Sequence, residues 1–155
     1  MLQRIQTVYL LMIVALFVAT LFMPLAILQS GDDLFRFDAT GLTEMSVDAR
    51  LLYPTWAIFG LTAIISLVSL VTVFLFRKRM LQIRFCIFNM LLMIGFYGLF
   101  IFFIYNLKES VGNASLSVSV KFALSFPFIG MILNYLAIRN IGADEALVRS
   151  LNRLR

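Results

Sequence analysis

The sequence predicts an all-α membrane protein, a bundle of four transmembrane helices with both termini on the cytoplasmic side. Apolar residues make up 62% of the 155 residues and charged residues 14%, whereas soluble domains average roughly 45–50% and 25%. Four stretches are long and apolar enough to cross a bilayer, and basic residues gather between alternate stretches. These observations exclude a water-soluble monomer and predict a single integral membrane domain over residues 1–155.

The composition also excludes several kinds of chemistry. The chain has no His and one Cys, which rules out a haem held by His, Ser-His-Asp catalysis, His-bearing zinc sites and an internal disulfide. A disordered chain is excluded as well, because disorder needs low hydrophobicity. We therefore expect no cofactor and no metal.

A spanning helix needs about 20 predominantly apolar residues. The stretches that meet this length are residues 5–28, 54–76, 85–107 and 118–138. The first exceeds the roughly 7–15-residue apolar core of a signal peptide, so we expect an uncleaved helix. Pro54 is expected in the first turn of the second span. Pro127 lies inside the fourth span and is expected to kink it; a break that coordinates substrate is the alternative.

The charges between the spans predict the orientation. Four basic residues flank one side, Arg36, Arg50, Lys108 and Lys121, and the remaining nine flank the other, Arg4, Arg77, Lys78, Arg79, Arg84, Arg139, Arg149, Arg153 and Arg155. Because basic residues stay in the cytoplasm, both termini are expected there.

Two segments on the opposite side alternate in polarity with a period of two. In residues 33–40, Phe35 and Phe37 alternate with Arg36 and Asp38, and residues 115–120 read Ser-Leu-Ser-Val-Ser-Val. Such alternation is typical of half-buried strands. The two segments could pair into a small extracytoplasmic β-ribbon or remain apart.

Four polar residues are expected to share one depth inside the membrane. Each lies five residues inside a basic residue at the cytoplasmic boundary; they are Tyr9, Thr72, Asn89 and Asn134. One interpretation is a hydrogen-bonded clamp between helices. The other is a pocket for a lipid headgroup or small ligand, open to the inner leaflet.

The cytoplasmic side offers a second candidate surface. It comprises Arg77, Lys78, Arg79, Arg84, Asp144, Glu145, Arg149 and Arg153. The basic linker either only sets topology or also attracts anionic lipid. Residues 144–154 predict a short amphipathic helix that either lies on the membrane or docks on a partner.

Three segments carry a family resemblance: residues 1–7, the linker 77–84 with Leu-Gln-Ile-Arg, and the ending 136–155 with Asp-Glu-Ala-Leu-Val-Arg-Ser. The chain resembles the DUF4293 family, small four-helix inner-membrane proteins of Bacteroidota. The resemblance implies a bacterial inner-membrane location and the four-span layout, and it brings no activity, cofactor or catalytic residue.

The leading functional hypothesis is a non-catalytic subunit or scaffold of an envelope complex, with membrane lipids and a membrane protein as partners. The alternative is a binder or carrier of a lipid or other amphipathic small molecule. An enzyme is the third class, since Asp32, Asp33, Asp38 and Glu44 offer carboxylates outside the membrane. Nucleic acid is not an expected partner, and the sequence leaves the oligomeric state open.

Overall fold

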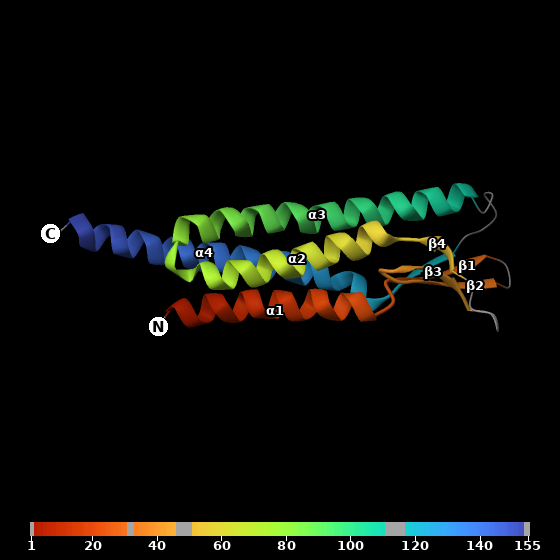
Figure 1. Cartoon of the computed structure of the whole chain (residues 1–155), viewed down its shortest axis with the longest axis horizontal. Helices are drawn as coiled ribbons and strands as arrows, with labels where there is room; N and C mark the ends of the chain where they lie inside the picture. The colour runs from red at the N-terminus through yellow and green to blue at the C-terminus, as the bar shows by residue number, and fades with distance from the viewer. Residues whose placement is uncertain (1, 31–32, 46–50, 111–116, 154–155) are drawn as a thin grey trace.

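A computed structural model describes residues 2–30, 33–45, 51–110 and 117–153. Within these residues, four long helices lie side by side and a small sheet lies at one end of them (Figure 1). The long helices are α1 (Leu2–Phe22), α2 (Trp56–Phe74), α3 (Arg79–Ser110) and α4 (Phe126–Arg153). Two short 3₁₀ helices, η1 (Leu75–Arg77) and η2 (Phe122–Ser125), follow α2 and precede α4.

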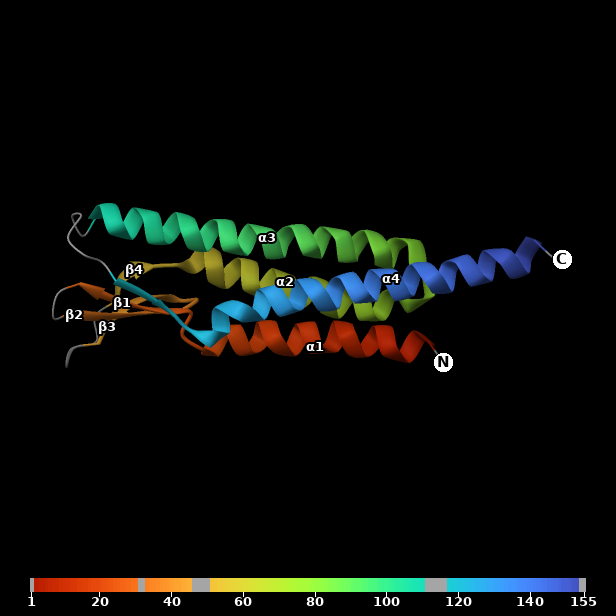
Figure 2. The same ribbon diagram turned by 180° about the vertical axis from the view of Figure 1, so that it is seen from behind.

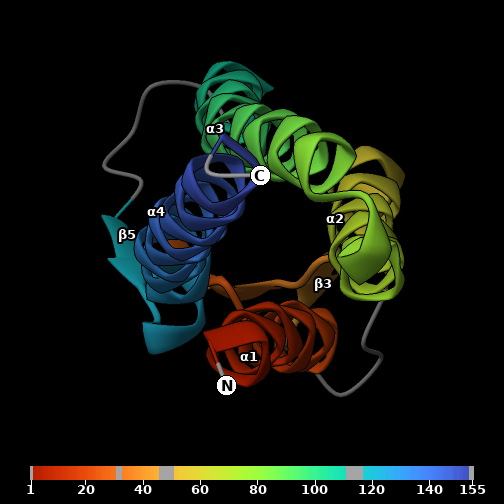
Figure 3. The same ribbon diagram turned by 90° about the vertical axis from the view of Figure 1, so that its left-hand side faces the viewer.

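The helices form a ring in which each packs on two neighbours. Seen along the bundle, the order around the ring is α1, α2, α3, α4 (Figure 3). Leu10, Phe17 and Met93 face inward and are fully buried, whereas Leu67, Leu91 and Ile101 are exposed on the outside. Within the described residues, all four long helices are apolar and long enough to cross a membrane. An exterior this apolar fits a multi-pass membrane protein.

The sheet closes one end of the bundle, opposite both termini (Figures 1 and 2). We call these the sheet end and the linker end, since the η1 linker between α2 and α3 lies beside the termini. The described strands are β1 (Ala26–Ser30), β2 (Asp33–Phe37), β3 (Gly41–Glu44), β4 (Leu51–Pro54) and β5 (Ser117–Val120). Their order is β4-β3-β2-β1-β5, and all neighbours are antiparallel.

The alternation predicted for residues 33–40 is confirmed, whereas β5 is exposed at three of its four residues. Of the two alternatives left open for these segments, the structure shows that they do not pair with each other. Phe37 is buried and Arg36 exposed, as expected for a half-buried strand. Strand β5 pairs with β1, which lies between β2 and β5. The observed strands are also shorter than residues 33–40 and 115–120, and residues 115 and 116 lie outside the described residues.

The first span was predicted to reach residue 28, and this boundary is wrong. Helix α1 ends at Phe22, and residues 26–30 are strand β1. Pro24 explains this, because proline has no N–H to continue a helix and its ring disfavours helical geometry at Met23. The apolar residues that follow then pair on both sides, with Leu28 opposite Phe35 and Val118.

The other predicted spans also need new boundaries. Pro54 ends β4, so it is not in the first turn of α2. Helix α3 extends the predicted 85–107 at both ends. The fourth helix starts at Phe126 and not at residue 118, which places Pro127 in its first turn, where no helical hydrogen bond is lost and no mid-span kink arises.

The tail helix predicted for residues 144–154 is not a separate element but the end of α4. Helix α4 runs without a break through Gly142 to Arg153, so residues 144–153 are its last turns, and residue 154 lies outside the described residues. These turns project beyond the other helices at the linker end, roughly along the line of α4 (Figures 1 and 2).

Candidate functional site

The interior of the bundle contains a group of buried polar side chains in the half nearer the linker end, which we call the polar layer. Its members are Gln6, Ser69, Thr72, Gln82, Asn89 and Asn134. They come from all four long helices. Their exposed fractions range from 0% to 5%, so their hydrogen bonds must be made inside the protein.

Two asparagine amides join neighbouring helices. Asn89 Nδ2 on α3 donates to Ser69 Oγ on α2 at 2.8 Å. Asn134 Nδ2 on α4 donates to the Cys86 carbonyl oxygen on α3, also at 2.8 Å. These bonds link α2, α3 and α4 in sequence around the ring.

Thr72 and Gln82 form a further contact between α2 and α3. The Thr72 hydroxyl donates to the Val68 carbonyl of its own helix at 2.6 Å, and Gln82 Nε2 donates to the Thr72 carbonyl oxygen at 3.3 Å. This contact places Gln82 against the last turn of α2, closer to the linker end than Ser69.

The four residues predicted to share one depth are therefore only partly brought together. Thr72, Asn89 and Asn134 are buried, whereas Tyr9 is half-buried against the core. The side-chain hydrogen bonds of the three buried members all go to residues outside the predicted set.

Sequence reasoning missed Gln6, Ser69 and Gln82. Ser69 lies three residues before Thr72, so it faces nearly the same side of α2. The same helical spacing, applied to every polar residue near a basic boundary, would have found it.

Three atoms of the polar layer lack a hydrogen-bond partner. They are Gln6 Nε2, Asn89 Oδ1 and Asn134 Oδ1. An unsatisfied buried polar group costs about 1–3 kcal/mol. One donor and two acceptors are thus left without a partner inside the bundle.

The second candidate surface lies at the linker end, between the start of α3 and the last turns of α4. Arg79 Nη2 lies 3.4 Å from Asp144 Oδ2, and Arg79 Nη1 donates to the Asp144 carbonyl oxygen at 3.1 Å. This contact ties the projecting part of α4 to the beginning of α3.

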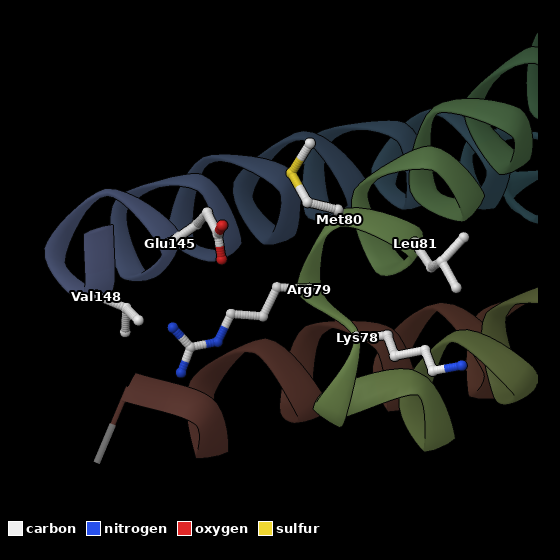
Figure 4. Close-up of a pocket in the computed structure, with 6 residues that line it drawn as sticks. All are labelled: Lys78, Arg79, Met80, Leu81, Glu145 and Val148. Carbon is white, nitrogen blue, oxygen red and sulfur yellow. The ribbon is translucent and has the colours of Figure 1, made fainter. Parts of the chain in front are cut away.

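An open hollow of about 440 Å³ lies beside that contact, lined by Lys78, Arg79, Met80, Leu81, Glu145 and Val148 (Figure 4). Arg79 extends toward the last turns of α4, whereas Lys78 and Leu81 point the other way. The hollow thus has both charged and apolar walls.

Of the predicted linker-end residues, the structure brings Lys78, Arg79 and Glu145 to one hollow and pairs Arg79 with Asp144. Arg84 lines a separate hollow farther along α3. The side chains of Arg77, Arg149 and Arg153 lie outside the described residues.

Of the acids expected outside the membrane, Asp33, Asp38 and Glu44 lie in or beside strands β2 and β3 at the sheet end. Asp38 Oδ1 pairs with Arg36 Nε at 2.9 Å, and Asp32 lies outside the described residues. Within that same part, no group of three or more His, Cys, Asp or Glu side chains is placed to hold a metal ion.

The described residues form a bundle of four helices that are long and apolar enough to cross a membrane, with a short antiparallel sheet at one end. Within this class, the chain belongs to the DUF4293 family, described as a domain of unknown function, whose model matches residues 2–154. The family resemblance seen in the sequence is thereby confirmed. A comparison with curated proteins gave no match.

Proposed function

We propose that this protein is a non-catalytic subunit or scaffold that crosses a bacterial inner membrane four times and holds a partner protein at its linker end. The apolar exterior supports the membrane location, because a water-exposed surface of this kind would aggregate. The nine basic residues expected on one side support a cytoplasmic linker end and cytoplasmic termini.

The projecting end of α4 carries the proposal. The 28 residues of α4 span about 42 Å at 1.5 Å per residue, whereas the hydrocarbon core of a bilayer is about 30 Å thick. Its last turns continue the line of the helix (Figure 2), so they point away from the bundle and do not fold across its end. This direction favours docking on a partner over lying on the membrane.

The composition of this end also suits a protein partner. Leu147 and Val148 are exposed there, and Val148 lines the hollow with Arg79 and Glu145. An apolar contact surrounded by charged groups is the usual anatomy of a protein interface. The Arg79–Asp144 contact holds α4 in place, which lowers the entropy lost when a partner binds.

A charge placed in the hollow should test this proposal. Val148→Asp should remove a native complex seen on a blue-native gel of mildly solubilised membranes, whereas Ala146→Asp should keep it. Ala146 is exposed and lies on nearly the opposite side of the helix from Val148. A protein that migrates alone in the wild type, or a complex that survives Val148→Asp, would contradict the proposal.

A binder or carrier of a lipid or other amphipathic small molecule is the second candidate, and the unpartnered atoms of the polar layer favour it. A hydroxyl or amide group could donate to Asn89 Oδ1 or Asn134 Oδ1, which have no donor in the protein.

Native mass spectrometry should then show a retained small molecule that is lost from the Asn89→Leu, Asn134→Leu double variant. Asn106→Leu is the matched control, because Asn106 Nδ2 donates to Phe102 O in its own helix. If the double variant keeps the bound mass and only melts at a lower temperature, the polar layer is a clamp alone.

A further inference from the structure

Two hollows at the linker end meet at one residue of α3. Leu81 lines the hollow described above and also a second one of about 260 Å³, formed with Arg84, Phe85 and Phe88. The pair therefore runs from the linker, past Leu81, along the first turns of α3.

The second hollow is an apolar stripe with one cation. Leu81, Phe85 and Phe88 follow one another at steps of four and three residues, which places them on one face of the helix. This face points away from the core: Leu81 is 37% and Phe88 50% exposed. On the outside of a membrane-spanning helix, such a surface contacts acyl chains.

Arg84 and Lys78 supply charge next to this stripe. Both are exposed, and neither forms an ion pair within the part of the chain that the structure describes. Asp144 is already paired with Arg79, and Glu145 lines the opposite, α4 side of the larger hollow. Arg84 has a long aliphatic stem that can follow the apolar stripe while its guanidinium reaches the membrane surface.

We propose that the second hollow, together with Lys78 on the α3 side of the larger one, binds one anionic phospholipid of the adjacent leaflet. Its acyl chain lies along Leu81, Phe85 and Phe88, and its phosphate lies between Arg84 and Lys78. The fork of an arginine can donate two parallel hydrogen bonds to phosphate oxygens. An extra negative charge on the headgroup adds attraction that a zwitterionic lipid lacks.

The assignment rests on the membrane insertion given under Proposed function and not on the docked partner. If the chain stays soluble without detergent, membrane insertion is refuted before any lipid is added. A lost partner complex with retained lipid selectivity would contradict only the scaffold role.

The test uses the full chain, delipidated in mild detergent and titrated with phosphatidylglycerol or phosphatidylcholine of identical acyl chains. Native mass spectrometry should show one phosphatidylglycerol bound more tightly than phosphatidylcholine. Arg84→Gln should reduce this preference by about fivefold, the factor that corresponds to one surface charge, and Arg84→Lys should keep most of it. Lys78→Gln should reduce it further.

Matched variants separate a defined site from general attraction to a basic surface. Arg139→Gln removes an exposed cation from α4 that lines neither described hollow, and it should leave the preference unchanged. Phe88→Ala should weaken both lipids alike, whereas Phe102→Ala, exposed farther along α3, should weaken neither. Equal binding of the two lipids by the wild type, or equal losses in the Arg84 and Arg139 variants, would overturn the proposal.

Discussion

The rings of Phe37 and Phe100 meet edge to face, with their centroids 5.5 Å apart and their planes at 89°. Phe37 belongs to β2 and Phe100 to α3, and both are buried. This contact places the sheet on the bundle, so that strands and helices share one core. The sheet is therefore part of the fold and not an appendage.

Phe37→Ala should lower the free energy of unfolding by about 3–5 kcal/mol, because it removes a fully buried aromatic ring and leaves a cavity. Thermal unfolding in detergent, followed by circular dichroism, measures the effect. Phe22→Ala is the control, since Phe22 is exposed at the end of α1 and should change the melting temperature little. Equal shifts for the two variants would show that the ring contact contributes nothing specific.

Gly130→Ala should destabilise the bundle by about 1–3 kcal/mol through overpacking. A Cβ at this position would lie 3.0 Å from Phe17 Cε2 and 3.5 Å from Met93 Cε, and Phe17 is fully buried. Gly98→Ala on α3 meets no atom within 4 Å, so the better helix propensity of alanine should stabilise it by up to about 1 kcal/mol. If the two substitutions change the free energy of unfolding in opposite directions, the close approach of α1, α3 and α4 is confirmed. Changes in the same direction would refute it.

Asn89→Ala and Ser69→Ala should couple in a double-mutant cycle, because each removes one partner of the same interhelical hydrogen bond. Such bonds in membranes contribute about 0.6 kcal/mol on average and up to about 1.7 kcal/mol. Unfolding in mixed detergent micelles gives the four free energies. A cycle of Asn106→Ala with Ser69→Ala should be additive, and an additive Asn89 cycle would mean that the clamp does not form.

Asp144→Asn should loosen the last turns of α4 while leaving the bundle folded. Its pair with Arg79 is partly exposed, 23% and 15% for the two side chains, so it contributes at most about 1 kcal/mol. Hydrogen exchange of residues 142–153 should accelerate by up to about fivefold. Asp38→Asn is the control: it breaks the ion pair with Arg36 at the sheet end and should leave hydrogen exchange in α4 unchanged. Identical exchange in the wild type and in Asp144→Asn would show that the Arg79–Asp144 pair does not hold the end of α4.

The helices could be identified from sequence patterns because a helix depends on interactions between residues that are close together in the chain. A helix satisfies its own backbone hydrogen bonds, so an apolar stretch of sufficient length predicts it without reference to the rest of the chain. The alternation of Phe35 to Asp38 predicted a strand because successive side chains of a strand point to opposite faces, which is also a local property. Three of the four proposed polar residues are also buried, because polar side chains on apolar helices find hydrogen-bond partners toward the neighbouring helices.

The partners of these elements depended on tertiary structure. Residues 26–28 continue the apolar run of α1 beyond Pro24, and their place in the sheet depends on pairing with β2 and β5. Ser69 and Asn89 lie 20 residues apart in the chain, and no local spacing predicts that they meet.

The amino-acid sequence alone therefore specifies the number of long apolar helices and the side on which the basic residues gather. Tertiary contacts set the order of the strands, the hydrogen bonds of the polar layer and the direction of the end of α4. The reason is physical: burial and helical periodicity act between near neighbours in the chain, whereas strand pairing and interhelical contacts join residues that only folding brings together.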